Sequence, residues 1–366
     1  MKKLGFGFMR LPQTDAADTK SIDLPQVVRM VDHFLAHGFR YFDTAYPYHA
    51  GVSEEAIRQT LVERYPRDAF ELADKMPVWM VKTGADYARI FAEQLSRCGV
   101  DYFDNYMLHA LDAERYPECV ERGGFAFLQT LKERGQARRV GFSYHDKVAL
   151  LERILSEQTV DFVQLQINYL DWDDAGVQAR ECYEVATAHG VPVIVMEPLK
   201  GGTLANVPAQ VRGLFAAHNA DSPAAWALRY AASLENACMV LSGMNDFAQL
   251  TENVQIMQSL TPLDARAHAV VQTAVESLHA ANVIPCTACK YCVNECPAKI
   301  LIPNMLRLYN DQHVFGLLPR FTNHYKFLTE SAGKASACVA CRQCEAHCPQ
   351  HIAIAHWMGE VAGVFG

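Results

Sequence analysis

The sequence of 366 residues has no apolar run long enough to cross a membrane. It contains no stretch of about 18 consecutive apolar residues, and the apolar part of MKKLGFGFMRLPQ is shorter than a signal peptide requires. We therefore expect a soluble, cytoplasmic protein with no membrane partner.

Positive charge is also scarce. The chain has 33 Lys and Arg against 41 Asp and Glu, a formal net charge of -8, and no long basic block. This balance argues against nucleic acid as a partner. Half of the residues are hydrophobic, and the length suits one large domain of about 250 to 280 residues with a small appendage.

No GxGxxG motif follows an early strand, which counts against the open, doubly wound sheet that binds dinucleotides. What is present, up to about residue 280, is an alternation of apolar strands and amphipathic helices. Eight strands in this pattern predict an α/β fold, a closed parallel (β/α)8 barrel of the TIM type. The expected strands are 5–9, 40–44, 70–75, 104–109, 139–143, 162–168, 193–197 and 239–243, and the helices between them include 53–64, 85–97, 147–156, 177–189 and 223–232.

Twelve cysteines are present, and eight of them fall in two matching runs. The runs are CTACKYCVNECP and CVACRQCEAHCP, with the spacing Cys, two residues, Cys, two residues, Cys, three residues, Cys, Pro. This spacing is typical of bacterial ferredoxins with 4Fe-4S clusters; zinc is the alternative ligand. The other cysteines are scattered singly and read as reduced thiols: Cys98, Cys119, Cys182 and Cys238.

Three thiolates on one loop can bind three irons of a cube, and in two-cluster ferredoxins the fourth cysteine of each run binds the other cluster. By that rule one cluster takes Cys286, Cys289, Cys292 and Cys348, and the second takes Cys338, Cys341, Cys344 and Cys296. We predict a barrel over 1–282, ending in a connecting helix at 263–281, and a ferredoxin-type domain over 283–366. Helices are expected between the runs, at 303–315 and 320–331.

Polar residues end several of the predicted strands, and in such barrels chemistry lies at these carboxyl ends. Each one alone has a structural explanation, such as a satisfied core histidine or a capping carboxylate. Together they point into one space. They are Asp43, Lys75, His109, Ser143, Gln166 with Asn168, and Glu197, with Tyr48 on the loop after Asp43.

The set resembles the aldo/keto reductase family. The resemblance is carried by YFDTAYPY, LADK, DNYMLH, GFSYH, EPLKGG and LSGMNDFAQLTEN, and it covers about three quarters of the chain. With the cysteine runs, the chain is similar to the ferredoxin-fused branch of that family. The resemblance implies an oxidoreductase that reduces a small carbonyl compound or oxidises an alcohol.

The resemblance also implies roles for four residues. Tyr48 would donate the proton that the developing alkoxide needs. Lys75 would stabilise the tyrosinate and lower the pKa of Tyr48 by roughly 1 to 3 units, and Asp43 would keep Lys75 charged and oriented. Neutral His109 would donate to the carbonyl oxygen.

The family pattern further implies a nicotinamide cofactor. Ser143 and Gln164 would contact its carboxamide, with Gln166 as the alternative contact on the same strand face. The other expected contacts are Phe8, Met9 and Arg10 at the pocket mouth, Met196 under the nicotinamide, Leu199, Gly201 and Gly202 along the pyrophosphate, and Gly243, Asn245, Gln249 and Asn253 around the adenosine phosphate.

The chain departs from the family pattern at three places. Met196 stands where many members have an aromatic ring, and Tyr144 where many have an asparagine after the serine. Gln249 and Gly243 stand where many have a cation for the 2′-phosphate. The sequence leaves NADP, NAD and a flavin open.

Three functions remain open at this point. The clusters exchange electrons between the barrel and an external carrier such as ferredoxin or flavodoxin, or they are structural or oxygen-sensing in an NAD(P)H-dependent reductase, or the chain is an electron-transfer subunit with a degenerate barrel. The first meets a difficulty, since clusters move single electrons and nicotinamide moves hydride.

Overall fold

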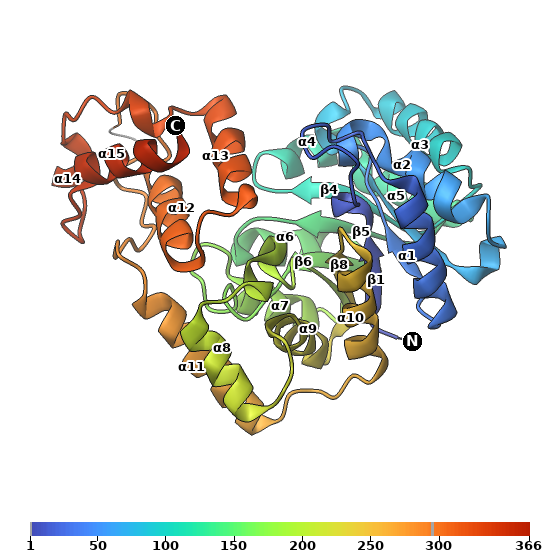
Figure 1. Cartoon of the computed structure of the whole chain (residues 1–366). Helices are drawn as coiled ribbons and strands as arrows, with labels where there is room; N and C mark the ends of the chain where they lie inside the picture. The colour runs from blue at the N-terminus through green and yellow to red at the C-terminus, as the bar shows by residue number, and fades with distance from the viewer. Residues whose placement is uncertain (1, 294–295) are drawn as a thin grey trace. The chain divides into compact units, whose positions relative to one another are not determined.

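The computed structural model describes residues 2–293 and 296–366. Eight parallel strands form a closed barrel in chain order, and β1 pairs with β8 to complete it, which confirms the predicted fold class (Figure 1). The strands are β1 Leu4–Gly7, β2 Tyr41–Asp43, β3 Glu71–Met76, β4 Phe103–Leu111, β5 Ala137–Tyr144, β6 Phe162–Gln166, β7 Val193–Met196 and β8 Ala237–Gly243. No helix in the described ranges has both the length and the hydropathy to span a membrane.

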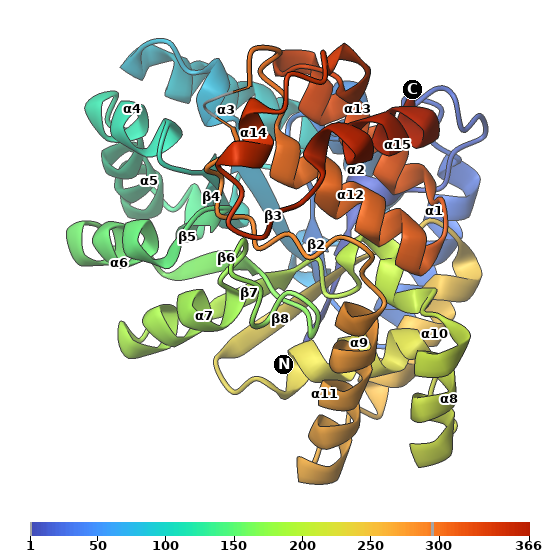
Figure 2. The ribbon, with the colours of Figure 1, turned by 90° about the vertical axis from the view of Figure 1, so that its left-hand side faces the viewer.

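The helices follow the strands along the chain. In Figure 2, α3, α5, α6 and α7 lie outside the strands that they connect. The helices up to the end of the barrel are α1 Leu24–Ala36, α2 Ser53–Ile57, α3 Gly84–Cys98, α4 Arg115–Glu121, α5 Gly124–Glu133, α6 Val148–Glu157, α7 Ala179–Ala188, α8 Ala209–His218, α9 Pro223–Ser233 and α10 Phe247–Gln258. They are followed by α11 Ala265–Ala280, α12 Ile302–Phe315, α13 Pro319–Ser331, α14 Gln343–Ala346 and α15 Ile354–Phe365.

Local sequence signals set the ends of the helix that follows β3. Thr83 and Asp86 form a capping box at the start of α3, which satisfies backbone N–H groups that a helix leaves unpaired. Gly99 ends α3 with φ 71°, a conformation that glycine adopts without steric cost.

Several expected elements end earlier than predicted, among them the strand over 162–168, which ends at Gln166. The first strand stops at Gly7, and residues Phe8–Arg10 form a 3-10 turn, η1. Here the backbone leaves the sheet because it bonds to side chains: Ser53 donates to the carbonyl of Phe8, and the N–H of Leu11 donates to His49. The helix predicted over 53–64 is α-helical only to Ile57 and continues as a π-turn over Arg58–Val62.

The chain packs as two compact units. One contains Met1–Gly201 and Ala224–Asp264, and the other contains Gly202–Pro223 and Ala265–Gly366. The second unit includes α8 and α11 as well as the two cysteine runs. Its apolar core contains Ile302 and Met305 of α12, Phe321 of α13 and Met358 of α15. A domain boundary at 282/283 stays a prediction.

Candidate active site and cysteine pockets

Along each strand, side chains point alternately into the barrel and to its outer face, so every second residue faces the interior. A buried cluster inside it contains Tyr41, Ala73, Met107, Phe162 and Ile194. Two positions further along the same strands, and therefore on the same face, come the polar strand-end residues, except that Met196 follows Ile194. They are Asp43 on β2, Lys75 on β3, His109 on β4 and Gln164 on β6. The apolar layer thus supports a polar layer at the carboxyl ends of the strands.

Lys75 and Asp43 form a buried ion pair in this layer. The Lys75 Nζ lies 2.5 Å from Asp43 Oδ1 and 2.7 Å from the carbonyl oxygen of Thr44. The exposed fractions are 1% for Lys75 and 3% for Asp43. Burial lowers the pKa of Lys75, but the opposing interactions, the charge of Asp43 first among them, outweigh it and the net pKa is raised. Lys75 is therefore held as an ammonium ion.

Tyr48 lies beside this ammonium ion. The Lys75 Nζ is 4.9 Å from the centroid of the Tyr48 ring. Burial raises the pKa of Tyr48, and the opposing charge of Lys75 does not overcome it. The net direction is opposite to the lowered pKa that we expected from the sequence, because the cost of burying a phenolate exceeds the attraction to one ammonium. Tyr48 is therefore a neutral phenol at neutral pH.

His109 faces Tyr48 from β4. Their ring centroids are 6.0 Å apart with an interplanar angle of 84°. Burial lowers the pKa of His109 well below its usual value, and the charges of Lys75, His145 and Arg115 lower it further. Its Nδ1 is buried and has no hydrogen-bond partner among the described residues, so Nε2 is the nitrogen that can serve a substrate. The imidazole is neutral, as the proposed role requires.

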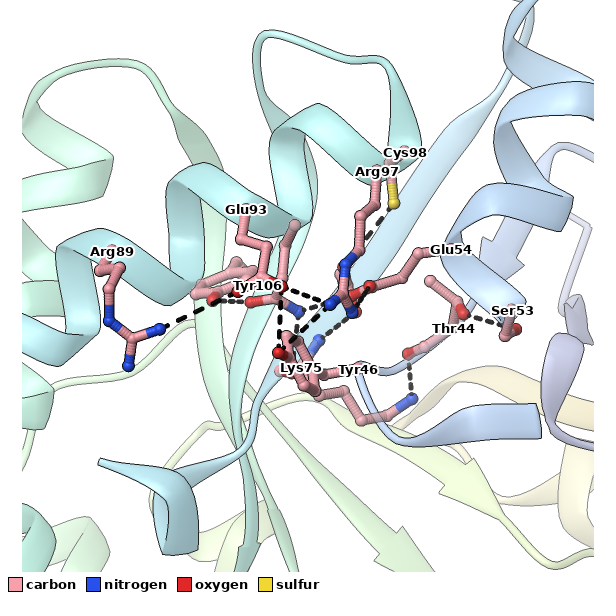
Figure 3. A network of polar contacts seen from close by, with 12 residues as sticks. Thr44, Tyr46, Ser53, Glu54, Lys75, Arg89, Glu93, Arg97, Cys98 and Tyr106 are labelled. Atoms are coloured by element: carbon pink, nitrogen blue, oxygen red, sulfur yellow. Dashed lines mark hydrogen bonds and ion pairs between the residues drawn. The ribbon is translucent and has the colours of Figure 1, made fainter. Parts of the chain in front are cut away.

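A polar network lies behind Lys75, on the outer side of β3 (Figure 3). Gln94 of α3 donates to the carbonyl oxygen of Lys75 and to Glu54, both at 3.1 Å, and Arg97 donates to the other oxygen of Glu54. Asp74 accepts from the N–H of Lys75 at 2.8 Å. Burial raises the pKa of Asp74 well above its ordinary value, and nearby Glu54 raises it further. The network fixes the backbone of Lys75 on both sides.

The expected carboxamide contacts differ in how open they are. Ser143 is buried, and its Oγ accepts the N–H of Ala110 at 2.7 Å. Gln164 pairs with Ser143 in the sheet and is 1% exposed, with its Oε1 unpartnered among the described residues. Gln166, at the end of β6, and Met196 are half-buried. Gln166 is thus more accessible than Gln164.

The residues expected around the adenosine phosphate do not form one open set. Gln249 is exposed and bonds to Asn245 at 2.6 Å and to Asp246 at 2.9 Å. Asn253 is 4% exposed and donates to Ser242, so its amide group faces the protein. Gly243 lies next to the side chain of Arg10.

Some of the residues expected at the pocket mouth and in the segment after β7 already bond to other groups of the protein. Arg10 pairs with Glu197 at 2.9 Å, Met9 is half exposed, and Phe8 is buried. In the segment expected along the pyrophosphate, the N–H of Lys200 donates to the carbonyl of Glu197. That N–H is therefore not available to a phosphate. Leu199, Gly201 and Gly202 are half-buried.

The cysteine runs line two pockets in the second unit. One pocket has Cys286, Cys289, Cys292 and Cys348 in its wall. The other has Cys338, Cys341, Cys344 and Cys296. Each pocket thus combines three cysteines of one run with the last cysteine of the other run. Four thiols around one pocket are a donor set that fits a 4Fe-4S cluster.

The backbone of the two runs is matched position by position. Ala288 and Lys290 of the first run have φ values of 52° and 68°, and Ala340 and Arg342 of the second have 52° and 58°. After the last cysteine of each run, Lys299 and His351 have 52° and 50°. Such left-handed residues turn backbone N–H groups into a concave nest that suits anionic clusters. The backbone conformations of the two runs, like their thiols, therefore fit a 4Fe-4S cluster.

Sequence reasoning did not identify three residues that border the catalytic set. Trp79 follows β3, is 40% exposed, and lies 5.2 Å from His109 between ring centroids. Arg115 covers the Trp79 ring at 5.6 Å. His145 directly follows β5 and lowers the pKa of His109 by its charge. The sequence signal that could have identified Trp79 was an aromatic residue shortly after Pro77, at the end of β3.

Comparison with protein families matches both parts of the chain. Residues 3–276 match the model of the aldo/keto reductase family. Residues 285–353 match the model of a 4Fe-4S dicluster domain.

Two curated proteins are similar over about half of the chain. One is an uncharacterized oxidoreductase, YtbE, of Bacillus subtilis, which is 27% identical over 187 residues. The other is an NADH-specific methylglyoxal reductase of Escherichia coli, which is 25% identical over 184 residues. The alignments cover 50% and 46% of this chain, and 62% and 54% of the relatives' lengths.

Solved structures share the fold. An aldo-keto reductase from Bacillus halodurans, AKR11C1 in its holo form, superposes with a TM-score of 0.61 at 23% identity and covers 74% of this chain and 91% of its own. An aldo-keto reductase from Klebsiella pneumoniae in complex with NADPH gives 0.59 at 20% identity, covering 74% and 90%. The chain belongs to the aldo/keto reductase family and carries a C-terminal 4Fe-4S dicluster domain.

Proposed function

We propose that the chain is an oxidoreductase that reduces a small carbonyl compound, or oxidises the corresponding alcohol, at the carboxyl ends of the barrel strands. The observation that carries this proposal is Lys75, a buried ammonium held 2.5 Å from Asp43 and beside the ring of Tyr48. One relative is named as a methylglyoxal reductase. Short α-dicarbonyl compounds are therefore suitable test substrates.

In this proposal Tyr48 is the proton donor. A nicotinamide, when bound, would supply hydride to the carbonyl carbon, and the oxygen then needs a proton. The neutral phenol of Tyr48 carries that proton at neutral pH. The ammonium of Lys75 would stabilise the tyrosinate that remains. Asp43 and the carbonyl of Thr44 hold that ammonium in place.

His109 would orient the carbonyl oxygen by donating a hydrogen bond from its neutral ring. Trp79 would form the aromatic wall on the other side of His109. Removing the imidazole ring of His109 should impair the orientation of the carbonyl without removing the proton donor.

The lowered pKa of His109 predicts how stability depends on pH. In the unfolded chain a histidine takes up a proton near pH 6.5, and His109 in the folded chain does so only at lower pH. Between these values the unfolded state binds more protons, so the free energy of unfolding falls as the pH falls below about 6.5. Replacing His109 by glutamine should make this fall shallower.

Urea unfolding at pH 7.5 and 5.5 measures this effect as a difference between variant and wild type. The exposed His313→Gln variant is the control and should follow the wild-type slope. Equal pH dependence in His109→Gln and wild type would show that His109 is not held neutral.

We propose that the barrel binds a nicotinamide dinucleotide. Ser143 keeps a hydroxyl proton to donate, and Gln166 stands half-buried at the end of the neighbouring strand. The 2′-phosphate has no assigned cation, because Arg10, beside Gly243, is paired with Glu197. We therefore propose NAD(P)H without a preference between the two forms.

We further propose that Cys286, Cys289, Cys292 and Cys348 hold one 4Fe-4S cluster and that Cys338, Cys341, Cys344 and Cys296 hold the second. Such clusters supply single-electron transfer. Cys289 and Cys341 are exposed, which favours electron exchange with an external carrier such as ferredoxin or flavodoxin over a purely structural role. We place the start of this domain at residue 283.

The crossed ligand sets predict the outcome of paired substitutions. Cys292→Ser with Cys348→Ser removes two ligands of the same cluster, so about four irons per chain should remain. Cys344→Ser with Cys348→Ser removes one ligand of each cluster and should cost iron at both sites. Iron and acid-labile sulfide in anaerobically purified protein give the measurement.

The reverse pattern, with iron kept by the Cys344 and Cys348 pair and lost from the other, would mean that each run binds its own cluster. The unmodified chain should hold about eight irons and eight sulfides. Zinc without sulfide would remove the clusters from the proposal altogether.

A further inference from the structure

A second buried lysine–aspartate pair lies in the barrel unit, and the chemistry proposed above does not use it. Lys200, after β7, donates to Asp171 Oδ1, in the loop after β6. The exposed fractions are 4% for Lys200 and 0% for Asp171. Burying two charges costs several kcal/mol in desolvation unless the remaining groups are also satisfied. The other contacts of Asp171 therefore matter.

The second oxygen of Asp171 reaches back to the end of β6. It accepts hydrogen bonds from Gln166 Nε2 and from Asn168 Nδ2, both at 2.8 Å. Asn168 in turn accepts the N–H groups of Leu170 and Asp171. The loop after β6 is thus folded so that a charged carboxylate holds the side chain of Gln166.

This contact fixes which end of the Gln166 amide is free. A carboxylate paired with a lysine can only accept hydrogen bonds, so the nitrogen of Gln166 must face Asp171. Its Oε1, at the other end of the amide, is left as an acceptor. An unconstrained glutamine could present either end.

Ser143 has the opposite role, because it is left as a hydrogen-bond donor. Its Oγ accepts the N–H of Ala110, and its own proton remains to donate. Gln164 is the sheet partner of Ser143. Gln166 lies two residues further along the same strand face, roughly 7 Å from Gln164 by strand geometry. Gln164 also has an Oε1 without a partner among the described residues, but Gln164 is 1% exposed, so Gln166 is the more accessible acceptor beside the donor Ser143. One donor and one acceptor form the pattern that complements a primary carboxamide.

We propose that Lys200 and Asp171 are positioning residues that lock Gln166 with its Oε1 toward the cofactor, so that the site recognises the carboxamide NH2 of a nicotinamide. This inference rests on the proposed nicotinamide function. It selects Gln166 over Gln164, and it makes the site selective against a ring that carries an acetyl group in place of the carboxamide.

The test compares dissociation constants of the full, anaerobically purified chain for three probes. They are NAD(P)H, its reduced 3-acetylpyridine analogue, which has a methyl in place of the NH2, and ADP-ribose or its 2′-phosphate, which lacks the ring. Wild type should prefer the carboxamide over the acetyl form by about tenfold, the worth of one good hydrogen bond. Asp171→Asn should bring this ratio close to one and leave the affinity for ADP-ribose within about twofold.

A buried Lys200 without its partner could prevent folding of Asp171→Asn. The double variant Asp171→Asn with Lys200→Met removes both charges, and Gln166→Met removes the acceptor itself; both should lose the ratio in the same way. Asp104→Asn is the matched control, because Asp104 is a buried aspartate with arginine partners at the other end of the barrel. It should keep the wild-type ratio.

A wild-type ratio in the foldable Asp171 variants would overturn the inference while leaving nicotinamide binding intact. An equal loss of affinity for all three probes would overturn it too, since the pair would then only stabilise the fold. If wild type binds neither NADH nor NADPH, the proposed function fails together with the inference.

Discussion

Replacing Tyr48 by phenylalanine is expected to lower kcat for carbonyl reduction by about 100- to 10,000-fold, the usual contribution of a positioned proton donor. The change removes one oxygen atom and leaves the aromatic ring next to Lys75. Hydride transfer would then leave an alkoxide without its proposed proton donor. Steady-state kinetics with a short α-dicarbonyl substrate measure the loss.

The affinity for NAD(P)H should be almost unchanged in Tyr48→Phe, because no cofactor contact is assigned to the phenol. Tyr46→Phe is the matched control. Tyr46 lies on the same loop, but its hydroxyl bonds to Glu93 and Arg97, away from the proposed chemistry. A Tyr48→Phe variant as active as Tyr46→Phe would mean that another group supplies the proton.

Replacing Lys75 by methionine is expected to affect both stability and activity. Asp43 would remain 3% exposed without its counter-charge, and breaking a buried pair on one side costs about 3 to 5 kcal/mol. The tyrosinate would also lose its stabilising charge, so kcat should fall at least about 100-fold. Chemical denaturation and kinetics of the same preparation measure the two effects.

The double variant Asp43→Asn with Lys75→Met separates these effects. Removing both charges should restore most of the lost stability, because no unpaired charge stays buried. Activity should stay low, since the ammonium is still absent. Recovery of activity in the double variant would show that Lys75 matters for folding alone.

The barrel and its polar strand ends could be predicted because both depend on periodicity. Eight apolar segments separated by helices define the closed sheet, and the period of two residues along a strand carries Tyr41 to Asp43 and Ala73 to Lys75. This alternation can be recognised within a few consecutive residues. Recognising it does not require knowing which segments are in contact in the folded chain.

The supporting contacts could not be predicted in the same way. Gln94, Glu54 and Asp74 meet behind Lys75 although they come from α3, α2 and β3. Asp171 and Lys200 are 29 residues apart, and no motif signals that pair. The raised pKa of Tyr48 depends on burial, which is a property of the folded chain.

In the proposed function, the two parts of the chain would transfer different numbers of electrons. Iron–sulfur clusters exchange one electron and a nicotinamide exchanges a hydride. Exchange between them therefore requires an intermediary or a substrate that tolerates radical steps. The reductase chemistry proposed for Tyr48 and Lys75 does not depend on that exchange, and it can be tested on its own.

Transfer of deuterium from NAD(P)H labelled at C4 tests the central claim most directly. During reduction of a short α-dicarbonyl compound by the anaerobic holoprotein, one deuterium per turnover should appear on the carbon that was the carbonyl, as mass spectrometry of the product would show. Product formed at the full rate without the label would contradict direct hydride transfer in the pocket of Tyr48.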